Sequence, residues 1–166
     1  MNVNPEFFVS KMSRVFRAGA YEMGDVYNFI SDVMANVSAN GKDVAVLEMV
    51  ADEIFTNIMN YAYEREKCAD KWVTLEISLD GEAVTMAFID GGRPFDPLAT
   101  PTPDITLSAD EREIGGLGIH IMRSVMDDVS YLRDGDKNIL TTRKKINRES
   151  QALHKGAGIV DTRTKN

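Results

Sequence analysis

Residues 73–90 read VTLEISLDGEAVTMAFID. In the first half of this stretch apolar and polar residues alternate, which predicts a strand with one buried face. The alternating apolar residues are Val73, Leu75, Ile77 and Leu79. The pair Asp80-Gly81 is a favoured two-residue hairpin turn, and residues 83–89 form an almost continuously apolar strand. The stretch therefore predicts an antiparallel hairpin.

A second hairpin is predicted towards the C-terminal end. Residues 129–133 and 138–142 read as strands, and they flank the turn sequence Asp-Gly-Asp at 134–136. A brief strand at residues 12–17 is expected at a sheet edge. The strands therefore pair mainly with their neighbours in the chain.

Two segments show helical rather than strand periodicity. Apolar residues recur at spacings of three and four over residues 23–37 and again over residues 43–63. A third, short helix is expected at residues 119–127. Helices on one side and hairpins on the other predict an α+β fold, a two-layer sandwich of a mixed, largely antiparallel sheet with helices on one face.

Composition limits the classes of function. With 166 residues, 43% of them hydrophobic, the chain fits one soluble domain with a real core. The net charge of -7 argues against duplex nucleic acid as a direct ligand. No apolar run could span a membrane, no signal peptide opens the chain, and the lone Cys68 fits a reducing cytoplasm. Residues 141–166 are basic, and we expect a domain over 1–145 and a flexible tail over 146–166.

The stretch DGGRPFD at 90–96 follows directly on the second strand of the first hairpin. A carboxylate at the end of a core strand can accept a hydrogen bond from an exocyclic amine, which suits Asp90 to adenine. Gly91 and Gly92 would let the backbone approach a flat base without a Cβ in the way. The alternative is a strand followed by an ordinary Pro-containing turn.

Glu53 and Asn57 lie four residues apart on the longer predicted helix, so they point the same way. With Asn60 and Glu64 they form a polar strip directly beside the apolar stripe. Taken alone, the strip reads as an ordinary solvated flank. It gains meaning only from the motifs that follow along the chain.

The glycines of GGLG at 115–118 lead directly into the third helix. Free amides and the positive end of the helix dipole suit a phosphate chain there, although Gly-rich helix starts are common. The preceding connection, residues 97–114, is longer than most loops in a compact domain. It reads either as a mobile surface loop or as a lid that brings Arg112 to the terminal phosphate.

The order of these motifs resembles the gyrase, heat-shock-protein-90, histidine-kinase and MutL ATPase superfamily. Within it, EIFTNIMNYAY (53–63), DGGRPFD (90–96) and GGLGIHIMRSVMDDVSY (115–131) look like the bacterial anti-sigma-factor serine/threonine kinases. The resemblance covers about residues 10–145, and it implies the Bergerat-type ATP-binding fold.

The resemblance also implies roles for individual residues. Glu53 matches the general base and Asn57 the residue that holds Mg²⁺. Asp90 matches the adenine-reading acid, Gly92 the glycine beside the base, and Arg112 the catalytic lid arginine. Further nucleotide contacts are implied for Phe95, Gly115, Gly116, Leu117, Gly118 and Ile119.

Two positions depart from the family pattern. Tyr61 stands where many of these kinases have His, so no role of that His transfers. Where the superfamily often has a nucleotide-contacting Thr near the last strand, this chain offers either Asn138 or Thr141, and the sequence does not decide between them.

The sequence therefore predicts a cytoplasmic, ATP- and Mg²⁺-dependent serine/threonine kinase that phosphorylates a small antagonist protein and sequesters a sigma factor. A homodimer is implied by the resemblance, without contact to nucleic acid or membrane. The alternative is a non-catalytic, nucleotide-dependent partner-binding module. The catalytic half of a histidine kinase is disfavoured, since no helix pair carrying a phosphoacceptor His is found upstream.

Overall fold

The computed structural model describes residues 10–18, 22–63, 71–99 and 117–147. In chain order the elements are β1 (Ser10–Arg17), α1 (Met23–Ala35), α2 (Gly41–Asn57), η2 (Ile58–Ala62), β2 (Trp72–Asp80), β3 (Ala83–Asp90), η4 (Pro97–Ala99), α3 (Leu117–Val125), β4 (Asp128–Asp134) and β5 (Lys137–Lys145). Both predicted hairpins, the predicted edge strand and all three predicted helices are present.

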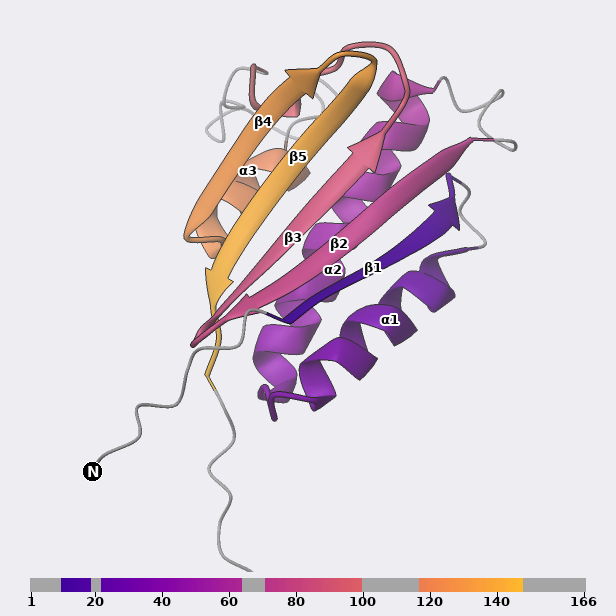
Figure 1. The fold of residues 1–166 in the computed structure, drawn as a ribbon. Coiled ribbons are helices and arrows are strands. Elements are labelled where there is room, and N and C mark those ends of the chain that lie inside the picture. The colour runs from indigo at the N-terminus through magenta and orange to yellow at the C-terminus, as the bar shows by residue number, and fades with distance from the viewer. Residues whose placement is uncertain (1–9, 19–21, 64–70, 100–116, 148–166) are drawn as a thin grey trace, which may run out of the picture.

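The strands form one five-stranded sheet in the order β1-β2-β3-β5-β4, with β1 at one edge as expected. Every pairing among the described strands is antiparallel, so the sheet is simpler than the mixed sheet allowed for by the sequence. The helices lie together on one face, which gives the predicted two-layer α+β sandwich (Figure 1).

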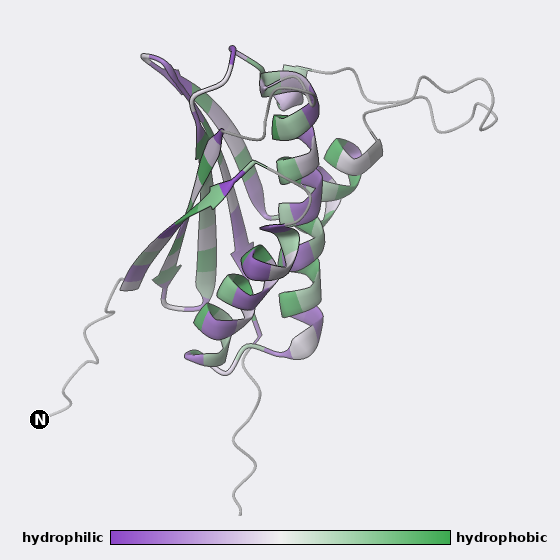
Figure 2. Cartoon of the chain, turned by 90° about the vertical axis from the view of Figure 1, so that its right-hand side faces the viewer, coloured by the Kyte–Doolittle hydropathy of each residue, from purple (hydrophilic) through white to green (hydrophobic). Residues whose placement is uncertain are grey.

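The core lies between the sheet and α2. Phe55 of α2 contacts Phe16 of β1 and Phe88 of β3 edge to face, with ring centroids 6.2 and 5.9 Å apart. All three rings are fully buried, and such tilted pairs stabilise a core beyond the area they bury. Figure 2 shows the apolar side of the helices turned towards the sheet. This packing fixes the position of α2 above the central strands.

The N-terminal end of α2 is tied to the chain that follows β5. The side chain of Asn40 accepts a hydrogen bond from the Asp43 amide at 2.8 Å, which caps the helix. Buried Asp43 in turn accepts from the Asn147 amide at 2.7 Å. Ile146 is buried as well and donates its amide to Glu82. Residues 146 and 147 thus belong to the folded body, although the sequence assigned them to the tail.

Within the ranges that the structure describes, no helix is both long enough and apolar enough to cross a membrane. The predicted lid (97–114) and basic tail lie largely outside these ranges. Of the lid only residues 97–99 are described, as the short turn η4.

Candidate functional site

A π-helical turn connects α2 to the loop after β3. In η2 the hydrogen bond runs from the Tyr63 amide to the Ile58 carbonyl, which widens the last turn of the helix. Arg93 donates two hydrogen bonds to this turn. Its Nε donates to the Tyr61 carbonyl at 2.5 Å, and its backbone amide donates to the Ala62 carbonyl at 3.0 Å. The turn therefore holds the DGGRPFD loop against the end of the helix that carries Glu53.

Asp90 is the last residue of β3, and its side chain points to the helix-covered face. It is only 4% exposed. Its Oδ1 accepts hydrogen bonds from the Gly92 amide at 2.8 Å and from Asn138 Nδ2 at 2.9 Å. Both bonds from described residues end on Oδ1, which leaves Oδ2 as the acceptor for a ligand. Oδ2 is thus suited to the amine donor predicted from the sequence.

The environment of Asp90 acts on its acidity in two directions. Burial raises the pKa of the carboxyl, whereas the hydrogen bonds from Asn138 and Gly92 and the positive charge of Arg133 lower it. Burial is the larger effect, so the net pKa lies above the ordinary value of 3.8. The three opposing groups limit the cost of keeping a buried carboxylate at this position.

Gly92 packs directly on η2. A Cβ at this position would lie 2.6 Å from the Ala62 carbonyl oxygen and 2.8 Å from its Cβ. The structure therefore gives a reason for this glycine that the sequence did not predict, namely close packing of the loop on the helix end. Its predicted place beside a base remains a prediction.

Glu53 and Asn57 are hydrogen-bonded to each other. Asn57 Nδ2 donates to Glu53 Oε1 at 2.6 Å and to the Glu53 carbonyl at 2.8 Å. Asn57 is 9% exposed and Glu53 is half-buried, so the pair lies at the edge of the core as the helical spacing predicted. Because Nδ2 is committed to Glu53, the Asn57 Oδ1 atom is the part of the amide that could bind a metal.

The start of α3 lies against this pair. A Cβ on Gly118 would collide with the carboxylate of Glu53, so the two residues are in direct contact across the helix interface. Two of the motifs predicted to share a site therefore meet in space. Gly115, Gly116, Arg112 and the side chain of Leu117 fall outside the described part of the chain.

Two further candidates, Ile119 and Phe95, make contacts with other apolar side chains. Ile119 is buried in the hydrophobic core, so its side chain has a packing role. The ring of Phe95 stacks on Tyr61, with centroids 4.9 Å apart and planes inclined by 21°. This pair lies at the junction of η2 and the DGGRPFD loop.

Of the two β5 candidates, Asn138 is the one whose side chain lies beside Asp90. Asn138 is the register partner of Asp90, whereas the side chain of Thr141 points to the opposite face of the sheet. Arg133 and Tyr131 of β4 also reach this point, because both donate to Asn138 Oδ1, at 2.9 and 2.7 Å. Arg133 and Tyr131 are not among the residues predicted for the site from the sequence. Their signal was the Asp-Gly-Asp turn, which sets residue 133 opposite residue 138.

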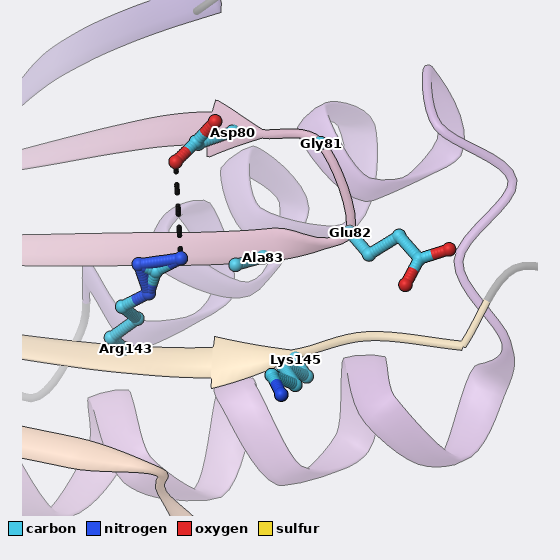
Figure 3. A pocket seen from close by; sticks show the side chains of 6 residues that line it. All are labelled: Asp80, Gly81, Glu82, Ala83, Arg143 and Lys145. Atoms are coloured by element: carbon cyan, nitrogen blue, oxygen red, sulfur yellow. Dashed lines mark ion pairs between the residues drawn. The ribbon is translucent and has the colours of Figure 1, made fainter. Parts of the chain in front are cut away.

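A cavity of about 380 Å³ lies elsewhere, at the turn between β2 and β3 (Figure 3). It is lined by Asp80, Gly81, Glu82, Ala83, Arg143 and Lys145, and Arg143 and Asp80 are 3.8 Å apart across it. Ala83 begins β3 and Asp90 ends it, so the cavity lies at the far end of the strand from Asp90.

Among the described residues no cluster of His, Cys, Asp and Glu could hold a metal ion on its own.

Known proteins match the chain over most of its folded part. A family model described as "Histidine kinase-like ATPase domain" matches residues 16–144. The chain is 32% identical over 95 residues to the serine/threonine-protein kinase BtrW of Bordetella bronchiseptica, covering 57% of this chain and 66% of BtrW. It is 28% identical over 101 residues to the anti-sigma F factor of Bacillus subtilis, covering 61% of this chain and 68% of that protein.

A solved structure shows the same fold. The RsbU and RsbW domains of Rv1364c from Mycobacterium tuberculosis align with a TM-score of 0.59 at 13% identity. The match covers 85% of this chain and 34% of that chain. The likeness therefore concerns the fold alone, and it covers about one third of that longer chain.

Proposed function

Because the chain belongs to the histidine kinase-like ATPase domain family and is similar to its anti-sigma serine kinases, we propose that it is an ATP-dependent serine/threonine kinase. Its substrate would be a small antagonist protein, and the chain would also sequester a sigma factor in the cytoplasm. The observation that carries this proposal is the contact of Glu53 with both Asn57 and Gly118. That contact brings two of the three motifs side by side, which supports a shared site.

The polar groups at the site fit Mg-ATP. Asp90 Oδ2 is an acceptor in an otherwise buried setting, which suits the exocyclic amine of adenine. Asn57 Oδ1 is an oxygen ligand of the kind that Mg²⁺ prefers, and the carboxylate of Glu53 lies beside it. When bound, Mg²⁺ neutralises charge on the phosphates. The residues that would hold the nucleotide are therefore Asp90 and Asn57, together with the backbone at the start of α3.

Glu53 is the candidate general base. Its Oε1 is held by Asn57, which leaves Oε2 to accept the proton of a Ser or Thr hydroxyl. That hydroxyl oxygen bonds to the γ-phosphorus as the bond from phosphorus to the β,γ-bridging oxygen breaks, and the proton passes to Glu53. Phosphoryl transfer depends mainly on alignment and charge neutralisation, so the fixed orientation of Glu53 is its main contribution.

The test compares Glu53→Ala with Asn57→Ala. We expect Glu53→Ala to keep ATP affinity and to lose about 10² to 10⁴ in the rate of phosphorylation, the usual contribution of a positioned base. Asn57→Ala is expected to lose Mg²⁺-dependent binding. Asp52→Asn is the matched control, since Asp52 is an exposed acid on the same helix that pairs with Tyr27. An antagonist protein is first isolated by pull-down with the parental chain in the presence of ATP. Calorimetry with ATP and transfer of labelled phosphate to that antagonist are then the readouts.

The same experiment separates the kinase from a nucleotide-dependent binding module. The module would bind ATP and its protein partner without moving phosphate, so Glu53→Ala would behave like the parental protein. If both variants phosphorylate the antagonist at the parental rate, the roles assigned to these two side chains are wrong.

We further propose that the chain forms a homodimer through the face of the sheet opposite the helices. One cross-strand row on this face runs through all five strands, namely Val15, Thr74, Ile89, Ile139 and Leu132. Val15 and Leu132 are 55% and 58% exposed. Residues of both charge signs flank the row, as with the ion pair between Lys11 and Glu76, so the face can complement a second copy across a two-fold axis. Sedimentation of parental protein and Leu132→Asp tests this; only monomer at high concentration in the parental protein would contradict it.

A further inference from the structure

The carboxylate of Asp90 is oriented by a group of three side chains from the last two strands. Asn138 on β5 donates its Nδ2 to Asp90 Oδ1 at 2.9 Å and to the Arg93 carbonyl at 3.0 Å. Arg133 and Tyr131 on β4 both donate to the Oδ1 atom of the same Asn138 amide. These residues join the loop, the strand end and the proposed base-reading acid in one hydrogen-bond network.

The chemistry of the network fixes the direction of every bond. A guanidinium can only donate and a carboxylate can only accept, so an amide between Arg133 and Asp90 has one permitted orientation. Its oxygen must face Arg133 and its nitrogen must face Asp90, as is observed. The Asn138 side chain is 3% exposed, so a reversed amide would leave buried groups unpaired.

The same arrangement determines which oxygen of Asp90 is available. Oδ1 receives the Asn138 amide and the Gly92 backbone amide. Oδ2 receives no hydrogen bond from the described residues. The network therefore leaves one acceptor, Asp90 Oδ2, in a fixed orientation for a ligand at the end of β3.

Arg133 contributes a second link. Its Nη1 donates to the Gly92 carbonyl at 2.9 Å as well as to Asn138. The guanidinium thus ties the loop to the network, and its positive charge lowers the pKa of Asp90. Tyr63 also lies near this point: its hydroxyl accepts from the Gly91 amide, and burial together with the charge of Asp90 raises the pKa of Tyr63.

We propose that Asn138, held by Arg133 and Tyr131, is the positioning residue that gives the site its selectivity for a purine with an exocyclic amine at position 6. This rests on the proposed function, in which Asp90 reads adenine. Without the Asn138 donor the carboxylate could rotate or take up a proton, and either change would remove the single fixed acceptor. A guanine carbonyl facing Asp90 Oδ2 would meet acceptor with acceptor, which is the discrimination that Asn138 preserves.

The experiment measures binding rather than phosphorylation. Calorimetry with ATP, with GTP and with purine riboside triphosphate, which has hydrogen in place of the amine, gives the selectivity of the parental protein. For Asn138→Leu, an apolar side chain of similar size, we expect ATP affinity to fall by about tenfold or more, as for loss of a hydrogen bond to a charged group. Affinity for purine riboside triphosphate should change much less, because that ligand does not use Oδ2.

The pH dependence of ATP affinity separates positioning from general structural damage. Asn138 lowers the pKa of Asp90, so its removal lets Asp90 hold a proton up to a higher pH. In Asn138→Leu the loss of ATP affinity on acidification should therefore begin at a higher pH than in the parental protein. Purine riboside triphosphate should show no such shift.

A matched control and a second variant keep the test decisive if Asn138→Leu folds poorly. Thr142→Val changes another buried residue on the same face of β5 and should leave the ATP to GTP ratio unchanged. Asn138→Asp keeps the shape but replaces the donor facing Asp90 with an acceptor, and it should also lose ATP selectivity.

Two outcomes distinguish failure of the positioning role of Asn138 from failure of the proposed function. If the parental protein prefers ATP but the Asn138 variants keep that preference and its pH profile, the positioning role is wrong and the proposed function stands. If the parental protein binds neither ATP nor purine riboside triphosphate, the proposed function itself fails.

Discussion

The carboxylate of Glu53 occupies the space in which a side chain at residue 118 would have to lie. Glu53 belongs to α2 and Gly118 to α3, so the contact links the candidate base to the helix start that the sequence associates with phosphate binding. The close approach requires glycine at 118. It also makes the position of the Glu53 side chain sensitive to any change there.

Gly118→Ala is expected to affect the reaction much more than the fold. The clash falls on the end of a flexible side chain, so Glu53 can rotate away and the melting temperature should change little. A displaced base should cost about 10² or more in the rate of phosphorylation. A double-mutant cycle with Glu53→Ala provides the check, because adding Gly118→Ala to that variant should lose little more. Full additivity would show that Gly118 acts independently of Glu53.

Gly92→Ala is expected to act on stability. Here the clash is with the backbone and Cβ of Ala62, neither of which can move without shifting η2. Overpacking of this kind costs about 1–3 kcal/mol, which chemical denaturation would detect as a lower midpoint. Gly91→Ala is the neighbouring control, since its Cβ would meet only the Tyr63 hydroxyl at 3.9 Å. Equal loss in both variants would contradict the packing role of Gly92.

The fold was largely predictable because its signals are local. Alternation in β2 and the pair Asp80-Gly81 predict a hairpin without knowledge of the rest of the chain. The turn itself lies one residue later than predicted, at Gly81 and Glu82, because Asp80 still pairs with Ala83. The strand ends were harder, and β5 continues through Lys145 although residues 143–145 are all basic. Backbone pairing with β3 extends the strand to the register partner of Ala83, while Arg143 and Lys145 project from the solvent-exposed face.

The site was predictable only where a motif lies within one element. Glu53 and Asn57 lie four residues apart on one helix face, so their spacing predicted that the two side chains lie together, although not what they do. Arg133 and Tyr131 reach the site through the register of β4, β5 and β3, which no single stretch of sequence states. The widened turn η2 was also missed, since apolar spacing does not separate an α-helical from a π-helical last turn.

Asp90→Asn is expected to weaken ATP binding and to stabilise the folded protein. The pKa of Asp90 is raised above 3.8 in the folded state. As the pH rises above about 3.8, the unfolded chain therefore loses this proton before the folded protein does. Ionised Asp90 then lowers the free energy of unfolding. Asn keeps an acceptor for Asn138 and Gly92 but carries no charge. The variant should therefore melt at or above the parental temperature at pH 7, with the gain shrinking as the pH falls towards 3.8.

The same variant should bind ATP at least about tenfold more weakly, since an amide donor would then face the exocyclic amine. Thermal melts over a pH series and calorimetry with ATP check the two halves of this prediction separately. Parental ATP affinity in Asp90→Asn would remove the base-reading role. A gain in stability that grows on acidification would contradict the sign derived from burial.

Thr142→Val is expected to stabilise the protein. The Thr142 side chain is fully buried between β3 and β4, and its Oγ1 atom has no hydrogen-bond partner within the described part of the chain. A buried hydroxyl without a partner costs about 1–3 kcal/mol, and Val has nearly the same shape without that cost. The melting temperature should rise by several degrees, as expected for about 1 kcal/mol in a domain of this size. Thr141→Val lies on the opposite, partly exposed face of β5 and should change stability by less than about 0.5 kcal/mol, so an equal gain at both positions would point to strand propensity rather than to the unpaired hydroxyl.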